Sequence, residues 1–186
     1  MGLGLRYSPL EWSGEKLKYN GKEISLNSMA CASGFKGVGT LYKSSVVKQN
    51  EIIKTEIMID LTGAASSTTD LDIIGTLGVS HIGQVTTAIN GVILYGQMRC
   101  LETPAGGADD IDLYAATEGT GAFDGGVAAL VETALITKGG AWAGAVTPVI
   151  FAAPVVADKY LYLTCGEAGT AASYTAGRFL LELWGY

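Results

Sequence analysis

The residues best suited to chemistry lie between Thr103 and Gly126, in the stretch TPAGGADDIDLYAATEGTGAFDGG. Three aspartates fall within four positions there: Asp109, Asp110 and Asp112. An acidic loop that contains glycine can supply several oxygen ligands to a calcium ion, which takes six to eight. The stretch has neither the alternating Asp/Asn pattern nor the final glutamate of a calcium-binding hand. The three aspartates are therefore weak candidates for metal ligands.

A structural role competes with metal binding at the same aspartates. In a strand that begins near Asp110, side chains alternate between two faces. Ile111 and Leu113 would then pack into a core, while Asp112 faces water. Charges on the solvent face of an edge strand discourage pairing with other chains. We favour this edge-strand role over a metal site, and we expect no bound cofactor.

Catalytic groups are scarce in the chain. His81 is the only histidine, and no Gly-x-Ser-x-Gly motif is present to supply a nucleophile for a serine triad. Ser80 directly precedes His81, and adjacent side chains in a strand point to opposite faces. A cysteine nucleophile paired with His81 is left open, although no spacing supports it. Phosphate-binding and dinucleotide-binding motifs are absent as well. We expect that the protein is not an enzyme.

The cysteines Cys31, Cys100 and Cys165 show no CxxC or Cys/His spacing. Cys100 and Cys165 lie in apolar, strand-like runs, which is typical of buried free thiols. Such thiols suit a protein that is made in the reducing cytoplasm of a host cell.

Nucleic acids and membranes are disfavoured as partners. Residues 1–60 carry a net charge of +2 and residues 61–186 one of −8, whereas phosphate binding needs clustered cations. The longest uncharged apolar run, residues 143–157, contains Pro148 and Pro154 and is shorter than the ~20 residues of a spanning helix. No signal peptide is recognisable at the start of the sequence.

The composition indicates a surface that is partly buried against other subunits. Charged residues make up 16% of the chain, against about 25% in ordinary globular proteins. Glycine accounts for 26 of the 186 residues, which is twice the usual share of about 7%. A chain with few charges and many small residues has difficulty in covering its own surface. The alternative is a glycine-rich, all-β monomer with many tight turns.

The front of the chain, residues 1–38, is predicted to be an extended arm with one hairpin. In the stretch Glu15 to Leu26, the pair Asn20-Gly21 separates two alternating runs and favours a type I′ turn. Residues 27–39 contain several glycines, and we interpret them as an adaptable linker. The remaining residues, 39–186, are predicted to form one compact body.

The body is predicted to be built of short strands. Residues 50–61 alternate most clearly, with the apolar residues Ile57 and Ile59 on one face and the charged residues Lys54 and Glu56 on the other. Further strands are predicted near residues 71–78, where a glycine interrupts the run, and near residues 82–87, 93–102, 111–116, 146–153, 159–165 and 174–186.

One helix is predicted, in the stretch from Val127 to Leu135. Apolar residues recur there at the positions i, i+3, i+4, i+7 and i+8, which is the stripe of a helical surface. Asp124 would cap the start of this helix, Lys138 would lie in its last turn, and a pair of glycines would end it. Short strands, glycine turns and one short helix indicate an all-β, antiparallel sandwich. A jelly roll is the favoured topology.

The aromatic residues have two interpretations. Exposed tryptophan and tyrosine rings can stack on sugars, whereas buried ones fill cores and subunit contacts, and we favour the second role. The residues concerned are Tyr7, Trp12, Tyr19, Tyr160, Tyr162, Tyr174, Trp184 and Tyr186.

The stretch from Thr55 to Tyr186 resembles small structural proteins that tailed phages encode close to the gene of the major capsid protein. The resemblance rests on HIGQVTTAINGVILYGQMRCLETPAGGADDIDLYAATEGTGAFDGG and on KYLYLTCGEAGTAASYTAGRFLLELWGY. The segments CLETPAGGADDIDLY, YLYLT and YTAGRFLLELWGY are the most similar. Residues 1–49 do not contribute to the resemblance.

The resemblance implies a virion structural protein on the capsid surface, which decorates or cements the phage head. The expected partners are the major capsid protein and further copies of the chain itself, as a homotrimer. The weakly basic arm is the expected contact with the shell. Its candidate interaction residues are Arg6, Tyr7, Trp12, Lys16, Lys18, Lys22 and Lys36. The alternatives are a receptor- or glycan-binding module of a tail or fibre, and a capsid protein that itself forms shells.

Overall fold

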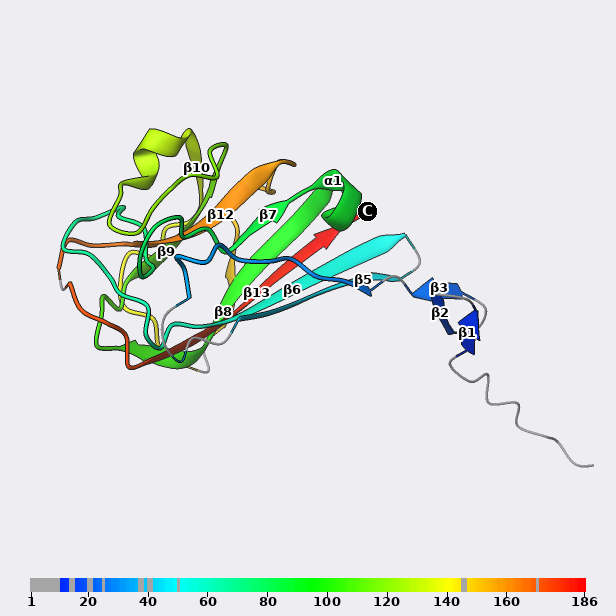
Figure 1. Ribbon diagram of the computed structural model, residues 1–186, viewed down its shortest axis with the longest axis horizontal. Coiled ribbons are helices and arrows are strands. Elements are labelled where there is room, and N and C mark those ends of the chain that lie inside the picture. The colour runs from blue at the N-terminus through cyan, green and yellow to red at the C-terminus, as the bar shows by residue number, and fades with distance from the viewer. Residues whose placement is uncertain are drawn as a thin grey trace, which may run out of the picture.

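The protein is a β-sandwich with a small additional sheet at its N-terminal end (Figure 1). The computed structural model describes residues 11–13, 16–19, 22–24, 26–36, 39, 42–49, 51–144, 147–169 and 171–186, with the backbone alone for those up to residue 26. Two antiparallel sheets of six and four strands pack face to face. The expected fold class, an all-β antiparallel sandwich, is confirmed.

The larger sheet has the strand order β11-β8-β13-β6-β5-β4. Its strands are β4 (Leu26–Asn27), β5 (Tyr42–Gln49), β6 (Ile52–Asp60), β8 (Ile93–Ala105), β11 (Val149–Ile150) and β13 (Ala176–Gly185). β13 lies at the centre and pairs with β8 on one side and β6 on the other. The chain thus returns to the middle of the sheet with its last strand.

The smaller sheet has the strand order β10-β9-β12-β7. Its strands are β7 (Gly83–Val85), β9 (Ile111–Ala116), β10 (Glu132–Ile136) and β12 (Lys159–Cys165). A helix of four residues, α1 (Thr87–Asn90), connects β7 to β8, and a single 3₁₀ turn, η1 (Val127–Leu130), precedes β10.

The strand pairs are nested in the manner of a jelly roll. β9 pairs with β10, β8 with β11, β7 with β12, and β6 with β13. Each pair encloses the previous one along the sequence, and successive pairs alternate between the two sheets. An eight-stranded jelly roll has this connectivity. The expected topology is therefore confirmed, and β5 and β4 extend the larger sheet beyond β6.

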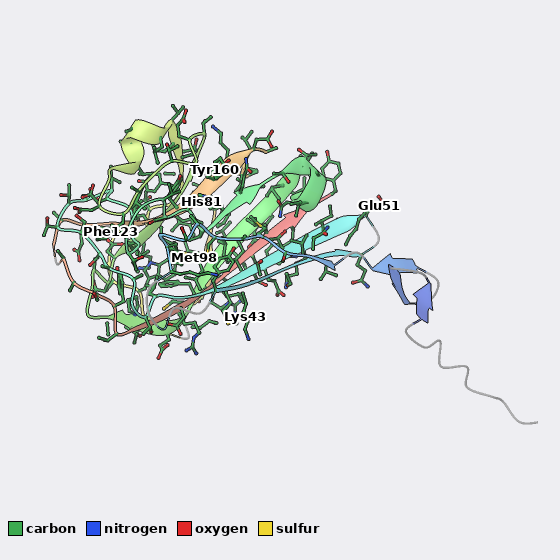
Figure 2. All side chains as sticks on the ribbon, in the orientation of Figure 1. Lys43, Glu51, His81, Met98, Phe123 and Tyr160 are labelled. Carbon is green, nitrogen blue, oxygen red and sulfur yellow. The ribbon has the colours of Figure 1, made fainter. Side chains whose placement is uncertain are left out.

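The core lies between the sheets, and β6 illustrates how the sequence specifies it. Ile57 and Ile59 are fully buried, whereas Lys54, Glu56 and Met58 are half-buried on the other face, as their alternation predicts. Side chains fill the space between the sheets (Figure 2), where Met98 is fully buried. The largest buried residues are Trp142, Tyr162, Tyr174, Phe35 and Phe179.

A second apolar cluster lies on the outer face of the smaller sheet, which we call the covered face. The loop and 3₁₀ residues of segments 71–80 and 117–131 pack there on β9 and β12. The cluster consists of Ile73, Tyr114, Ala116, Val127, Leu130 and Tyr162. Backbone hydrogen bonds hold the two segments together, with Ile73 accepting from Asp124 and donating to Gly125. The smaller sheet is thus buried on both faces.

The helix predicted from Val127 to Leu135 is wrong. Only Val127–Leu130 forms a turn, and Val131 then takes a left-handed conformation with φ of 56°. The following residues form β10, which pairs with β9. The apolar residues fit a helical stripe, but Leu135 and the β-branched Thr133 also fit a strand, and the free edge of β9 decides between them. Asp124 likewise has a positive φ of 63° and caps no helix.

The expected hairpin at the front of the chain is confirmed. β2 (Lys16–Tyr19) pairs with β3 (Lys22–Ile24), with Tyr19 opposite Lys22, and β1 (Glu11–Ser13) pairs with β2. These three strands form a sheet of their own.

The interpretation of residues 27–39 as an adaptable linker differs from the structure over residues 27–36. Phe35 is fully buried and Met29 is 6% exposed, and both belong to the core. Ala32 and Gly34 donate backbone hydrogen bonds to His81 and Val79. The segment packs on the sandwich because its apolar side chains complete the core, which a reading of its glycines alone does not anticipate.

Candidate functional site

The outer face of the larger sheet, which we call the open face, is the broadest candidate surface. Its side chains form three cross-strand rows along β8, β13, β6 and β5: Tyr95, Trp184, Lys54 and Val47; Gln97, Glu182, Glu56 and Ser45; Arg99, Leu180, Met58 and Lys43. The first and third rows combine apolar and charged residues, the second is polar throughout, and most of these residues are half-buried. On the edge strand β11, Ile150 is 59% exposed.

A polar network stiffens the middle of the open face. Lys54 Nζ lies 2.9 Å from Glu182 Oε1 and 2.7 Å from Glu56 Oε1. Gln97 donates to Glu182 Oε2 at 2.5 Å and accepts from the Tyr95 hydroxyl at 2.9 Å. Burial alone would raise the pKa of Glu182, but the hydrogen bonds from Lys54 and Gln97 outweigh it and lower this pKa below its ordinary value. Glu182 is therefore a buried, ionised anchor of this surface.

Two aromatic rings lie next to this network. The ring centroids of Tyr95 and Trp184 are 5.1 Å apart and tilted by 51°, and Lys54 Nζ lies 5.4 Å from the Trp184 centroid. A hollow of about 350 Å³ lies beside them, lined by Val47, Gln49, Ile52, Lys54 and Trp184. The tryptophan ring thus has neighbours of its own and is not a free platform.

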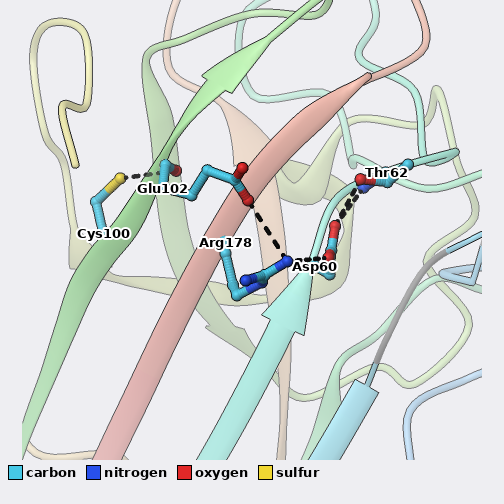
Figure 3. Close-up of polar contacts among 5 residues, drawn as sticks. All are labelled: Asp60, Thr62, Cys100, Glu102 and Arg178. Carbon is cyan, nitrogen blue, oxygen red and sulfur yellow. Dashed lines mark hydrogen bonds and ion pairs between the residues drawn. The ribbon is translucent and has the colours of Figure 1, made fainter.

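An ion pair between three strands marks the far end of the same face (Figure 3). Arg178 Nη2 lies 3.0 Å from Asp60 Oδ2 and 3.6 Å from Glu102 Oε2. Thr62 donates two hydrogen bonds to Asp60 Oδ1, from its backbone nitrogen and its hydroxyl. Burial opposes ionisation of Asp60, but these hydrogen bonds and Arg178 lower its pKa below the ordinary value. The contacts hold β13 in register with β6 and β8.

The structure corrects the edge-strand interpretation of the aspartates. β9 lies inside the smaller sheet, between β10 and β12, and is not an edge strand. Asp112 is 5% exposed and Asp110 is 4% exposed, so neither faces water, and only Asp109 is exposed. Ile111 and Leu113 do face the core, as predicted. Within the described ranges, no group of three or more His, Cys, Asp or Glu side chains could together hold a metal ion.

The candidate interaction residues are distributed over separate places. Arg6 and Tyr7 lie outside the described residues. Lys36 is exposed on the sandwich, with its Nζ 5.7 Å from the centroid of the Tyr42 ring. The others belong to the small sheet, with Trp12 on β1, Lys16 and Lys18 on β2, and Lys22 on β3. The structure therefore groups four of the seven residues in one sheet and places Lys36 apart from them.

His81 packs on the outer side of the smaller sheet. Its ring centroid is 4.9 Å from that of Tyr160, and both are visible there in Figure 2. Burial lowers the pKa of His81, which disfavours its charged form. Ser80 is buried, and its hydroxyl donates to the carbonyl of Gly78 rather than to the imidazole. Cys100 and Cys165 are buried free thiols, as predicted, and Cys31 is half-buried.

Sequence reasoning missed the open face as a candidate surface. Its members come from the consecutive strands β5 and β6 and from the distant strands β8 and β13, so no local motif marks them. The available signal was the alternation of Lys54, Glu56 and Asp60, which placed one polar face on β6 but did not show which strands would lie beside it.

Comparisons with models of known protein families, with curated proteins and with solved structures found no match to this chain. In the part of the chain that the structure describes, no helix has the length and apolar character needed to cross a membrane.

Proposed function

We propose that this chain is a virion structural protein, a decoration or cement protein that binds the assembled head of a tailed phage and stabilises its shell. The observation that carries the proposal is the small sheet β1–β3. It pairs within itself and extends beyond the sandwich (Figure 1). A paired segment outside a compact β body is typical of subunits that attach to their neighbours through such segments.

The register of the small sheet supports a binding role. Trp12, Leu17 and Ile24 form one cross-strand row, and Glu11, Lys18 and Glu23 form the next. The first of these rows is apolar and the second is charged. Among the described residues, this sheet contacts the sandwich mainly through β3 and β5, which makes β1 and β2 the candidates for contact with another partner.

The sandwich supports the same proposal with a second surface. Jelly rolls are common in viral capsid proteins, and the open face presents half-buried apolar side chains next to a fixed polar network. In a homotrimer, three small sheets would meet the repeating lattice of the major capsid protein together. Weak single contacts then add up, because the first contact raises the effective concentration of the others.

The glycan-binding alternative has less support. Sugar stacking needs an accessible aromatic face, whereas Trp184 is contacted by the ring of Tyr95 and by the ammonium group of Lys54. A sugar would first have to displace one of these neighbours. A shell-forming role has no specific observation in its favour.

The proposal is tested by co-sedimentation with phage heads that lack this protein. Full-length protein is expected to pellet with the heads, and deletion of residues 1–25 is expected to reduce pelleting at least about ten-fold, since it removes the small sheet and its multivalent contacts. The deletion must stop before β4, because Met29 and Phe35 belong to the core. The melting temperature of the shortened protein should therefore stay close to that of the full chain.

Two point variants sharpen the test within the small sheet. Leu17→Ser changes the apolar row and is expected to weaken pelleting, whereas Glu23→Ser changes the charged row and serves as the matched control. Equal pelleting of the full-length and shortened proteins would refute attachment through the small sheet. Failure of the full-length protein to pellet would refute the decoration role itself.

A further inference from the structure

Two cross-strand pairs, one joining β9 to β12 and one just beyond their ends, bring oxygen atoms together on the outer side of the smaller sheet. Asp112 lies directly opposite Thr164 in the antiparallel register. The next pair along is Asp110 and Gly166, joined by a backbone hydrogen bond from Gly166 to the Asp110 carbonyl at 2.9 Å. Residues opposite each other in an antiparallel pair belong to the same face, so their side chains are neighbours.

Gly166 allows the two carboxylates to converge. A Cβ atom at this position would lie 2.7 Å from Asp110 Oδ1 and 3.1 Å from Asp112 Oδ1. Both oxygens therefore lie close to one point beside the backbone. The bonds of calcium to oxygen are about 2.3–2.6 Å long, so an ion placed between two converging carboxylate oxygens can contact both.

Two of the oxygen atoms in this cluster have no hydrogen-bond partner among the residues that the structure describes. Asp110 Oδ1 and Thr164 Oγ1 are buried and make no hydrogen bond in the structure. Asp110 is only 4% exposed, and Thr164 is fully buried. Buried polar groups are almost always satisfied, and an unpaired buried carboxylate is costly. These two atoms indicate a ligand that the protein chain does not supply.

The negative charge of the two carboxylates also indicates a bound cation. Within the described residues, no lysine or arginine side chain pairs with Asp110 or Asp112. The backbone N–H of Lys138 donates to Asp112 Oδ1 at 2.7 Å, but its ammonium group is directed to the carbonyls of Gly140 and Ala141.

We propose that Asp110, Asp112 and Thr164 form a binding site for one hard divalent cation, for which Ca²⁺ is the best match. All donors are oxygen atoms, which excludes a preference for softer metals. Two carboxylates and one hydroxyl supply part of the six to eight ligands that calcium takes, and water completes the shell. The site is a property of the sandwich and does not depend on the role in the phage head.

Terbium luminescence tests the site directly, because Tb³⁺ replaces Ca²⁺ and is excited by a nearby tryptophan. Trp142 is suitably placed, since its Nε1 donates to the Ile111 carbonyl between the two aspartates at 2.7 Å. Excitation of tryptophan in the full-length protein is expected to give Tb³⁺ emission that added Ca²⁺ abolishes. Asp110→Asn and Thr164→Val are expected to lower the affinity at least ten-fold. Asp109→Asn, which changes the exposed neighbour, should leave it unchanged.

Thermal unfolding gives a second and independent measurement. Calcium at about a hundred times its dissociation constant is expected to raise the melting temperature by roughly 5–10 °C over that in EDTA. Asp110→Asn should remove this difference. Equal Tb³⁺ binding by the three variants would overturn the site. A melting temperature that does not change with calcium would also overturn it.

Discussion

The outer faces of the two sheets differ in how far their apolar side chains are shielded from water. On the covered face, segments 71–80 and 117–131 bury Tyr114 and Tyr162 under a second apolar cluster. On the open face no such layer exists among the described residues. Tyr95 remains 37% exposed, and a network of ion pairs and hydrogen bonds occupies the surface. Each sheet of the jelly roll thus has an outer face, and the loops of segments 71–80 and 117–131 make the outer face of the smaller sheet part of a core.

The largest difference between the faces should appear in their apolar residues. Ile73→Ala on the covered face is expected to lower the free energy of unfolding by about 2–5 kcal/mol, because the Ile73 side chain is fully buried and its truncation leaves a cavity in its place. The matched change on the open face, Ile150→Ala, is expected to cost less than about 0.5 kcal/mol. Urea denaturation measures both. Similar costs would show that the open face is not open in solution.

A smaller difference is expected for the tyrosine hydroxyls. The Tyr162 hydroxyl donates to the Glu118 carbonyl at 2.8 Å and accepts from the Gly121 N–H at 3.2 Å. Tyr162→Phe leaves the buried N–H unsatisfied and should cost about 1–3 kcal/mol by urea denaturation. Tyr95→Phe removes one half-exposed hydrogen bond and should cost less than about 0.5 kcal/mol. The reverse order would contradict the assignment of the covered face as a core.

The smallest effects concern acid, where the two faces are expected to respond with opposite sign. The lowered pKa of Glu182 stabilises the folded state above the unfolded pKa of about 4.5, and this stabilisation is lost as the pH falls through the folded pKa. Asp112 has the opposite effect, because burial raises its pKa in the folded state. Its ionisation destabilises the folded state, and this destabilisation grows as the pH rises from about 3.8 through the folded pKa.

Two variants separate these contributions in urea titrations between pH 3 and 7, with EDTA present. As the pH falls, Glu182→Gln should become more stable relative to the wild type. Asp112→Asn should become less stable relative to the wild type over the same range. Slopes of equal sign would mean that the two carboxylates do not have the opposite environments described above.

Much of the sandwich could be predicted because alternation is a local property. The faces of β6 and the hairpin of β2 and β3 follow from residue order alone, since side chains alternate along any strand and a turn residue acts on its neighbours. The short strands and glycine turns predicted an antiparallel sandwich, among which the jelly roll was the favoured topology. β10 was misread as a helix because its apolar residues fit both periods, and only the edge of β9 distinguishes them.

The candidate sites depended on contacts that the sequence does not display. Alternation correctly placed Ile111 and Leu113 in the core, but it could not show that β9 would be an inner strand with a second layer above it. Asp112 is buried for that reason. In the same way, the sequence of residues 27–36 did not show that Phe35 would be buried in the core, because its burial depends on a space formed by distant strands.

The sequence by itself determined that the protein is a glycine-rich antiparallel sandwich with few charges, because composition and the alternation of side chains along strands can be read directly from it. The tertiary structure alone decided which face is covered, where the open face gathers its polar network, and that Asp110 and Asp112 converge beside Gly166 with Thr164 opposite Asp112. These features arise between strands that are far apart in the chain, and such pairings are chosen by packing rather than by local preference.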